Sequence, residues 1–314
     1  MKIKNMLGSI PLHFVIIGLC ILWLLPTFGL LVTSFRPFQD INETGWWTVL
    51  SPRTPEEADR PRFTINNYVA ALVGYRGRKP YAEACLGETP DPDCAGTGLM
   101  SSQGMGRAFL NSVFVAVPAT ILPIIFAAFA AYAFSWLDFK GRQFLFVILV
   151  GLQVVPLQMT LIPIYRIYTK VGLNGTFLGV WLFHTGFGLP YAIYLLRNFI
   201  GSLPRDLFES AYLDGASPWT AFFRLALPLA TPAIASLTIF QFLWVWNDLL
   251  VALVFLGGTT PVLTYQISNM VTSLGAGWHL LTAAAFISMV VPLIVFFSMQ
   301  RFFVRGILAG SVKG

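Results

Sequence analysis

Six long runs of mostly apolar residues constrain what this chain can fold into. A helix needs about 20 such residues to cross the hydrocarbon core of a bilayer. Each run is apolar on every side, whereas the strands of a membrane barrel alternate in polarity over about ten residues. We therefore expect an all-α membrane protein with six transmembrane helices, at about 12–34, 108–136, 143–166, 177–199, 230–256 and 279–303.

The composition agrees with lipid as the solvent for much of the surface. Hydrophobic residues make up 56% of the 314 residues and charged residues only 11%, whereas soluble domains carry about 25% charged residues. The net charge is +6, but the basic residues are scattered along the chain. They form no run typical of nucleic-acid binding, so we expect membrane lipid and no nucleic acid as a partner.

The short loops indicate the orientation, because cytoplasmic loops are enriched in Lys and Arg. Six spans leave both termini on one side. With the N-terminus inside, the short outer segments hold two basic residues, Arg166 and Lys170, against ten in the inner segments. We expect a multi-pass protein of the inner (plasma) membrane, with both termini cytoplasmic and with a first span that is retained and not cleaved. The ten inner residues are Lys2, Lys4, Lys140, Arg142, Arg197, Arg205, Arg224, Arg301, Arg305 and Lys313.

The stretch 36–107 differs from the rest of the chain. It holds nine of the fourteen acidic residues and is rich in Pro and Gly, so we expect an irregular extracytoplasmic lobe with short helices, one of them at 66–72. Cys85 and Cys94 lie there, either as a local disulfide or as two exposed free thiols. Cys20, in the first span, is expected to be a small apolar filler.

This gives four expected parts. They are an N-terminal tail with the first helix at 1–35, the lobe at 36–107, a five-helix core at 108–303 that includes a cytoplasmic loop at 200–229, and a cytoplasmic tail at 304–314.

Sequence signatures of enzymes are missing. There is no phosphate-binding loop, no His-Glu-x-x-His and no Gly-x-Ser-x-Gly. The three histidines, His13, His184 and His279, are too far apart in sequence to indicate a metal site. We therefore expect neither catalysis of covalent chemistry nor a cofactor or metal bound by this chain.

The loop 200–229 predicts a helix, a turn and a second helix. Pro204 suits a first helical turn, and Gly215 suits a helix end. Ser217 is a cap and Pro218 a first residue for the second helix, which should end by Pro228. At 100° per residue, the first helix carries an apolar stripe that consists of Leu207, Phe208, Ala211 and Tyr212.

A short amphipathic helix either lies in the lipid interface or docks into a groove of a partner. The polar side is mixed and mildly acidic, not rich in Lys and Arg, and Leu213 lies among its polar residues. This charge pattern favours a protein groove.

Three segments of this loop, Glu209–Ala211, Asp214–Ala216 and Leu225–Pro228, resemble the EAA motif of the permease subunits of binding-protein-dependent ABC importers. The departures are small: Ser210 stands for Ala, and Leu225 for Ile or Val. Two further segments, Trp246–Leu253 and the C-terminal Gln300–Gly314, resemble the carbohydrate permeases, in particular the maltose and α-glucoside group.

The resemblance implies the partners and the mechanism. A second permease subunit completes the pore as a heterodimer, two cytoplasmic ATPases bind ATP and Mg, and an extracytoplasmic binding protein delivers the sugar. The first loop helix would couple transport to an ATPase, with Glu209 paired to a basic residue and Gly215 permitting the turn. The residues of this coupling site are Arg205, Leu207, Phe208, Glu209, Ala211, Tyr212, Asp214 and Gly215.

The favoured solute is a di- or oligosaccharide, such as the α-glucosides maltose or trehalose. An ABC permease for another solute, such as glycerol phosphate or a different glycoside, is an alternative. An ion-coupled secondary transporter is a second alternative, but such proteins usually show internal repeats and midplane charges, and we find no repeat and one acid within the spans.

Polar residues inside a membrane usually face a cavity or a partner helix. His184 is either bonded to a neighbouring helix or part of the substrate path. Asp248 either lines the path or a gate, or is a carboxylate that packs or caps a helix by pairing with Asn247 or a backbone donor. The candidates for the substrate path are Gln158, His184, Gln241, Asn247 and Asp248.

Overall fold

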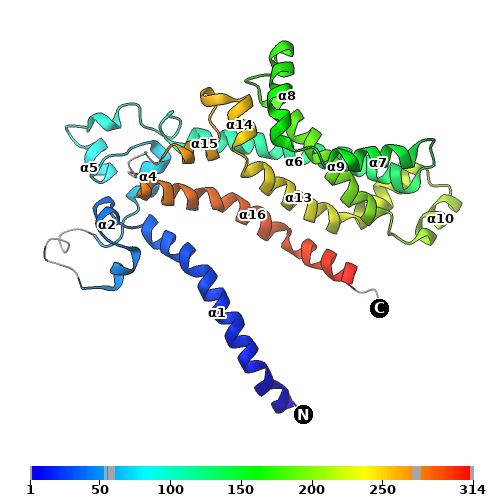
Figure 1. The fold of residues 1–314 in the computed structure, drawn as a ribbon, viewed down its shortest axis with the longest axis horizontal. Coiled ribbons are helices and arrows are strands. Elements are labelled where there is room, and N and C mark those ends of the chain that lie inside the picture. Colours follow the sequence, from blue (N-terminus) through cyan, green and yellow to red (C-terminus); the bar gives the residue numbers. More distant parts are fainter. Residues whose placement is uncertain (1, 53–54, 56–60, 271–276, 312–314) are drawn as a thin grey trace. The chain divides into compact units, whose positions relative to one another are not determined.

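The computed structural model describes residues 2–52, 55, 61–270 and 277–311, and all the regular structure in these segments is helical (Figure 1). The expected all-α class is thus confirmed for the described part of the chain. Two compact units make up the chain. One consists of 1–107 with 266–289, and the other of 108–265 with 290–314.

Three of the expected spans are single helices long and apolar enough to cross a membrane. They lie in α1 (Lys2–Ser34), α6 (Met105–Trp136) and α16 (Trp278–Ser311). Two bent helix pairs raise this number to five at most in the described residues. The fourth expected span is α9 (Phe177–Ile200), a helix of 24 residues. The total of six spans therefore stays a prediction.

The sequence predicted the third span as one continuous helix, and this prediction is wrong. It is broken into α7 (Arg142–Leu152) and α8 (Leu157–Val171), which are bent by 99°. Pro156 explains the break, because proline has no N–H to donate and keeps the preceding residue out of helical geometry. Between the helices, Gln153 to Val155 form a tight turn in which each amide donates to the carbonyl three residues earlier, at 3.1–3.2 Å.

The fifth expected span is also interrupted. It consists of α13 (Thr231–Trp246) and α14 (Leu250–Phe255), separated by residues 247–249. Short elements precede and follow it. They are α10 (Arg205–Leu213), α11 (Pro218–Ala221), the π-helical turn η3 (Phe222–Ala226), α12 (Leu227–Leu229), η4 (Gly257–Thr259) and α15 (Leu263–Ser268).

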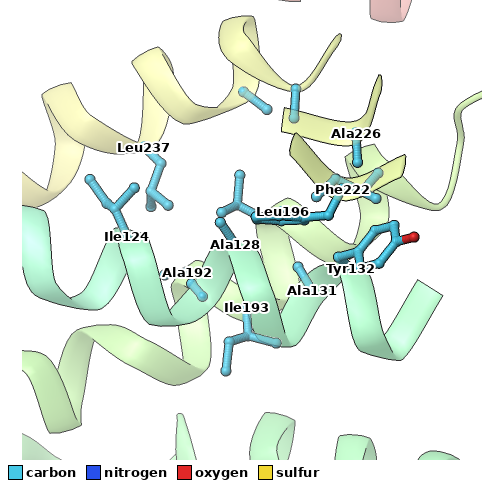
Figure 2. Close-up of a cluster of buried hydrophobic side chains, with 14 of the residues drawn as sticks. Ile124, Ala128, Ala131, Tyr132, Ala192, Ile193, Leu196, Phe222, Ala226 and Leu237 are labelled. Carbon is cyan, nitrogen blue, oxygen red and sulfur yellow. The ribbon is translucent and has the colours of Figure 1, made fainter. Parts of the chain in front are cut away.

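The core of the second unit lies where α6, α9 and α13 pack together (Figure 2). Alanines dominate it, and small side chains let helix backbones approach closely inside a membrane. Gln241 of α13 donates from Nε2 to the carbonyl of Ala119 in α6 at 3.2 Å. A Cβ on Gly188 of α9 would lie 2.7 Å from the same Nε2, so this glycine permits the close approach. The buried cluster comprises Ile124, Ala127, Ala128, Ala131, Tyr132, Ala192, Ile193, Leu196, Ile200, Phe208, Ala221, Phe222, Ala226, Ala230, Ala233 and Leu237.

The first unit contains the lobe that follows α1. Its short helices include one close to the range expected at 66–72. Asn67 of this helix donates from Nδ2 to the carbonyls of Ser34 and Arg36, at 2.9 and 2.8 Å, and so caps the end of α1. The buried Arg36 donates to the carbonyl of Gly45 at 2.8 Å. These bonds tie the lobe to the helix that precedes it. The elements are α2 (Phe38–Glu43), η1 (Trp46–Leu50), α4 (Asn66–Val73), α5 (Tyr81–Leu86) and η2 (Pro92–Cys94).

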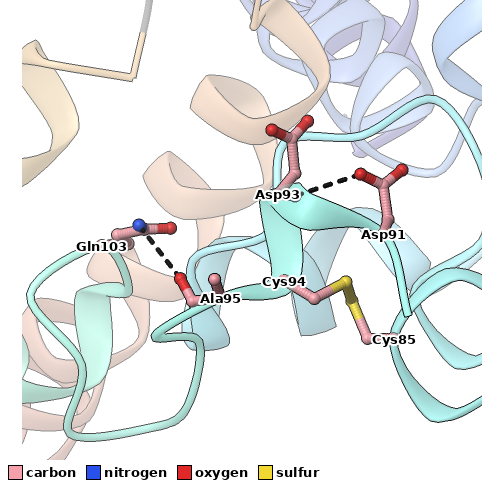
Figure 3. The surroundings of a disulfide bond; sticks show 6 residues. All are labelled: Cys85, Asp91, Asp93, Cys94, Ala95 and Gln103. Atoms are coloured by element: carbon pink, nitrogen blue, oxygen red, sulfur yellow. Dashed lines mark hydrogen bonds between the residues drawn. A yellow bond between two sulfur atoms is a disulfide. The ribbon is translucent and has the colours of Figure 1, made fainter. Parts of the chain in front are cut away.

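A disulfide joins Cys85 at the end of α5 to Cys94 in η2 (Figure 3). Of the two alternatives that the sequence left open, the structure contains the bond. The Asp91 carboxylate accepts a hydrogen bond from the Asp93 amide at 3.0 Å and thereby fixes the turn between the cysteines. Cys20 is a free thiol, exposed on α1.

Some expectations concern residues outside the described segments. Three acidic residues of the lobe, Glu56, Glu57 and Asp59, lie outside the described segments, and so does Lys313 of the expected tail. The preceding part of that tail continues α16 as helix to Ser311.

We predict that a non-reducing peptide map of the purified protein shows Cys85 linked to Cys94 and only Cys20 alkylated. The two cysteines are nine residues apart, so the loop-closure model assigns the bond about 2–3 kcal/mol of stabilisation of the lobe. Alkylation of all three cysteines without prior reduction would contradict the pairing.

Candidate coupling and substrate-path sites

The first helix of the loop 200–229 is α10, and its end is fixed by backbone geometry. Gly215 has φ of +82°, a conformation that glycine adopts without strain. Its amide donates to the Tyr212 carbonyl at 3.0 Å, and the Ala216 amide donates to the Ala211 carbonyl at 2.9 Å. This pair of bonds is a Schellman motif. The helix stop expected at Gly215 is therefore present.

The second helix begins as expected but does not end by Pro228. The Ser217 hydroxyl accepts from the Thr220 amide at 3.2 Å, and Pro218 opens α11. The π-helical turn η3 follows, and the Leu227 amide donates to the Phe222 carbonyl five residues earlier. The wider π-helical turn shifts the register of the backbone hydrogen bonds just before Pro228, which has no amide proton to donate. The helix runs on to Leu229 and then bends by 69° into α13.

Part of the apolar stripe of α10 packs against the chain's own helices, whereas Leu207, also in the stripe, is 45% exposed. Phe208 is fully buried and stacks on Trp136 of α6, with ring centroids 3.8 Å apart. The Tyr212 hydroxyl lies 3.0 Å from the Tyr132 hydroxyl, also on α6. The Trp136 indole donates to the Ile200 carbonyl at 3.2 Å and so ties α6 to the end of α9. Phe208 and Tyr212 therefore anchor α10, and Phe208 is inaccessible to another protein.

The opposite side of α10 is exposed. Leu213 has 89% of its surface accessible. Glu209 is exposed and makes no hydrogen bond or ion pair with any other described residue. The outward surface, which we call the exposed face of α10, consists of Arg205, Asp206, Leu207, Glu209, Ser210 and Leu213.

Asp248 lies in the break between α13 and α14 and caps the second of these helices. Its Oδ2 accepts from the amides of Val251 and Ala252 at 3.0 and 3.3 Å. One alternative for Asp248 was a carboxylate that caps a helix through backbone donors, and these donors are present. The carboxylate thus has a structural function at the start of α14.

His184 lies close to this carboxylate, with Nε2 3.9 Å from Asp248 Oδ2. The ring is fully buried and makes an edge contact with Trp244 at 5.2 Å between centroids. Neither ring nitrogen has a hydrogen-bond partner among the described residues. The bond to a neighbouring helix, which was one alternative for this histidine, is not seen there.

The other candidates of the substrate path do not join this pair. Gln241 is buried and binds the Ala119 carbonyl, as described above. Asn247 donates to the Leu243 carbonyl one turn earlier, at 2.8 Å. Gln158 is exposed at the start of α8. No group of three or more His, Cys, Asp or Glu side chains that suits a metal ion occurs in the described segments.

Sequence reasoning missed two features of these sites. The first is the anchor of α10 on Tyr132 and Trp136, for which periodicity gives no signal. The second is the break in the third span, which was detectable because Pro156 stands between Gln153 and Gln158 in an otherwise apolar run.

Comparison with known proteins identifies the family. Residues 119–309 match the family described as "Binding-protein-dependent transport system inner membrane component". The osmoprotective compounds uptake permease protein GgtD of Synechocystis sp. is 53% identical over 307 residues, which cover 97% of this chain and 92% of the relative. The alpha-glucoside transport system permease protein AglG of Rhizobium meliloti is 43% identical over an alignment of 366 residues, gaps included, that covers 96% of each chain.

A solved structure shares the fold. It is the crystal structure of a bacterial ABC transporter involved in the import of the acidic polysaccharide alginate. It matches with a TM-score of 0.65 at 17% identity, over 96% of this chain and 98% of that chain. Together with the match over residues 119–309 and the identity to GgtD, this fold agrees with the resemblance seen at residues 209–228. The chain belongs to the inner-membrane permease components of binding-protein-dependent ABC transport systems, and it is a transport subunit and not an enzyme.

Proposed function

We propose that the chain forms half of a heterodimeric pore that imports a di- or oligosaccharide, with α-glucosides such as maltose or trehalose favoured. Several relatives support a sugar as the solute, because their names specify alpha-glucosides, arabinooligosaccharides or melibiose, raffinose and stachyose. GgtD is named for osmoprotective compounds, so another small glycoside is the first alternative and glycerol phosphate the second.

The observation that carries the proposal is the two-sided packing of α10. One side is anchored on α6 through Phe208 and Tyr212, and the other is exposed and carries the unpaired Glu209. A helix held in this way transmits a push on its exposed face to the transmembrane core. We infer that this face lies in the cytoplasm, as do both termini, and that it contacts one of two partner ATPases, which bind ATP and Mg.

Within this proposal the coupling residues have distinct functions. Glu209 pairs with a basic residue of the ATPase, and Gly215 allows the chain to reverse at the end of α10. Arg205, Leu207 and Asp214 lie around that contact, whereas Phe208, Ala211 and Tyr212 hold the helix in place. An extracytoplasmic binding protein delivers the sugar from outside the cell membrane, and we infer from the loop charges that the lobe 36–107 is extracytoplasmic as well.

An ion-coupled secondary transporter is less well supported. Such proteins need a titratable or cation-binding group near the middle of the membrane. Asp248 is the only acid in the expected spans, and its Oδ2 is engaged by two backbone amides.

The decisive experiment reconstitutes the complete importer in liposomes and measures the uptake of labelled maltose, trehalose and glycerol phosphate with and without ATP. We predict uptake of a sugar only when ATP and the binding protein are present. Uptake that persists after the ATPase is omitted would establish the ion-coupled alternative.

We predict that Glu209→Lys and Gly215→Pro abolish ATP-driven uptake while the protein still inserts and assembles with the second permease. Charge reversal removes the pairing of Glu209, and proline cannot adopt the positive φ at position 215 or donate its amide bond. Glu88→Lys, a reversal on the exposed lobe, is the matched control and should transport normally. Wild-type uptake by both variants would refute the coupling function of α10.

Phe208→Ala should lower the stability of the permease by about 3–5 kcal/mol, because it removes a fully buried aromatic ring. Leu213→Ala removes an exposed side chain of the same helix and should change the stability by less than about 0.5 kcal/mol. Thermal unfolding of the purified permease measures both. Equal melting temperatures for the two variants would show that α10 is not anchored through Phe208.

A further inference from the structure

The break in the third span borders a groove on the second unit. The groove has a volume of about 320 Å³ and lies between the end of α7 and the middle of α9. This volume is within the range of small-molecule sites, about 300–1,000 Å³. It is lined by Leu152, Gln153, Val155, Gly186, Phe187, Pro190 and Tyr191, and we call it the break groove.

The backbone at the break has several polar groups without partners. In the backbone hydrogen bonds of the described residues, the carbonyls of residues 153–155 accept none. The amides of Leu157 and Gln158, in the first turn of α8, donate none. The side-chain amides of Gln153 and Gln158 are exposed and also lack partners in this part of the chain. Donors and acceptors thus gather within six residues.

On the proposed topology these groups lie in the broken third span, between α7 and α8, at a depth where lipid offers no hydrogen bonds. Each unsatisfied backbone group there costs several kcal/mol, so irregular backbone occurs at membrane depth only where protein covers it or where it lines a water-filled cavity. The described residues of the second unit leave the break uncovered, because Val154 is 82% exposed and Val155 43% exposed. These groups therefore need partners from outside the described chain, which are either the second permease or water and a polar solute.

The chemistry of the groove fits a sugar. Hydroxyl groups both donate and accept, and so match a mixture of free carbonyls and amides. On the facing helix, Tyr191 is 43% exposed and Phe187 is partly buried. Their rings offer an amphipathic surface for the C–H face of a sugar. Gly186 leaves open space beside them, because a Cβ there would meet no atom within 4 Å.

We propose that the break groove is a sugar-binding subsite at the middle of the membrane, contributed by this chain to the translocation path. The inference rests on the proposed function, since it takes a sugar as the solute. Gln153, Gln158 and the free backbone groups of the break bind the hydroxyls, and Phe187 and Tyr191 contact the ring. His184 and Asp248 do not line this groove.

The test uses thiol labelling in the complete reconstituted importer. The background is Cys20→Ser, which leaves the Cys85–Cys94 disulfide and no free thiol. Gly186→Cys places a thiol in the break groove. Ile162→Cys is the matched control outside the break groove, because Ile162 is an apolar residue of α8 that is 67% exposed. A charged, water-soluble methanethiosulfonate and a membrane-permeant maleimide are applied with and without saturating maltose or trehalose.

We expect the charged reagent to label Gly186→Cys but not Ile162→Cys. A transported sugar at about ten times its Kd should slow this labelling roughly tenfold, because it leaves about a tenth of the subsites free. Labelling by the maleimide alone would overturn the proposal, because the groove would then face lipid. No labelling by either reagent would also overturn it, since the second permease would then fill the groove. Labelling that no transported sugar slows would show a watery groove without a sugar subsite.

Failure of the proposed function gives a different result. In that case the Cys20→Ser importer takes up no sugar under ATP, whatever the labelling pattern. A Gly186→Trp variant supplies a second readout, because a Cβ at this position meets no atom within 4 Å and the indole beyond it would occupy the break groove. It should retain stimulation of ATP hydrolysis by the binding protein but lose sugar uptake, whereas Gly18→Trp, at a similarly open position in α1, should keep both.

Discussion

The stacking of Phe208 on Trp136 is the contact on which the mechanical interpretation of this permease depends. A nine-residue helix is marginal in water by itself, so α10 owes its position to the buried side that it shares with α6. The hydrogen bond between Tyr132 and Tyr212 adds a second point of attachment one turn further along α10. Because both attachments lie on the same transmembrane helix, the proposed coupling requires that a displacement of α10 displaces α6 as well. The exposed face, with Glu209 and Leu213, is then free to meet a partner.

The membrane imposes a second constraint, which the broken spans satisfy in two ways. In the break between α13 and α14, the Asp248 carboxylate accepts hydrogen bonds from two amides of the next helix, so these donors are satisfied within the chain. In the break between α7 and α8, neither a side chain nor backbone from the described residues does this for residues 153–155. The break between α7 and α8 therefore needs partners from outside the described chain, and the proposed subsite assigns them to water and solute.

Much of the fold could be predicted from the sequence, because a helix in lipid must be apolar on every side and its length is set by the bilayer. The stop at Gly215 was predictable for an equally local reason, the positive φ that glycine tolerates. The breaks were not predicted, since an apolar run of 24 residues reads as one helix even when Pro156 divides it. The burial of Phe208 was also missed. Periodicity defines an apolar stripe, but it does not say whether the chain's own helices or a partner covers that stripe.

The most direct measurement is sugar uptake by an importer in which α10 is locked to α6. A Tyr132→Cys/Tyr212→Cys pair in the Cys20→Ser background, bridged by a short bifunctional maleimide, replaces the hydrogen bond between the two hydroxyls by a covalent link. If α10 and α6 move as one body, the bridged importer transports sugar at the same ATP-dependent rate as the unbridged one. If bridging abolishes uptake while ATP hydrolysis continues, α10 must move relative to α6, and coupling through the Phe208 anchor is wrong.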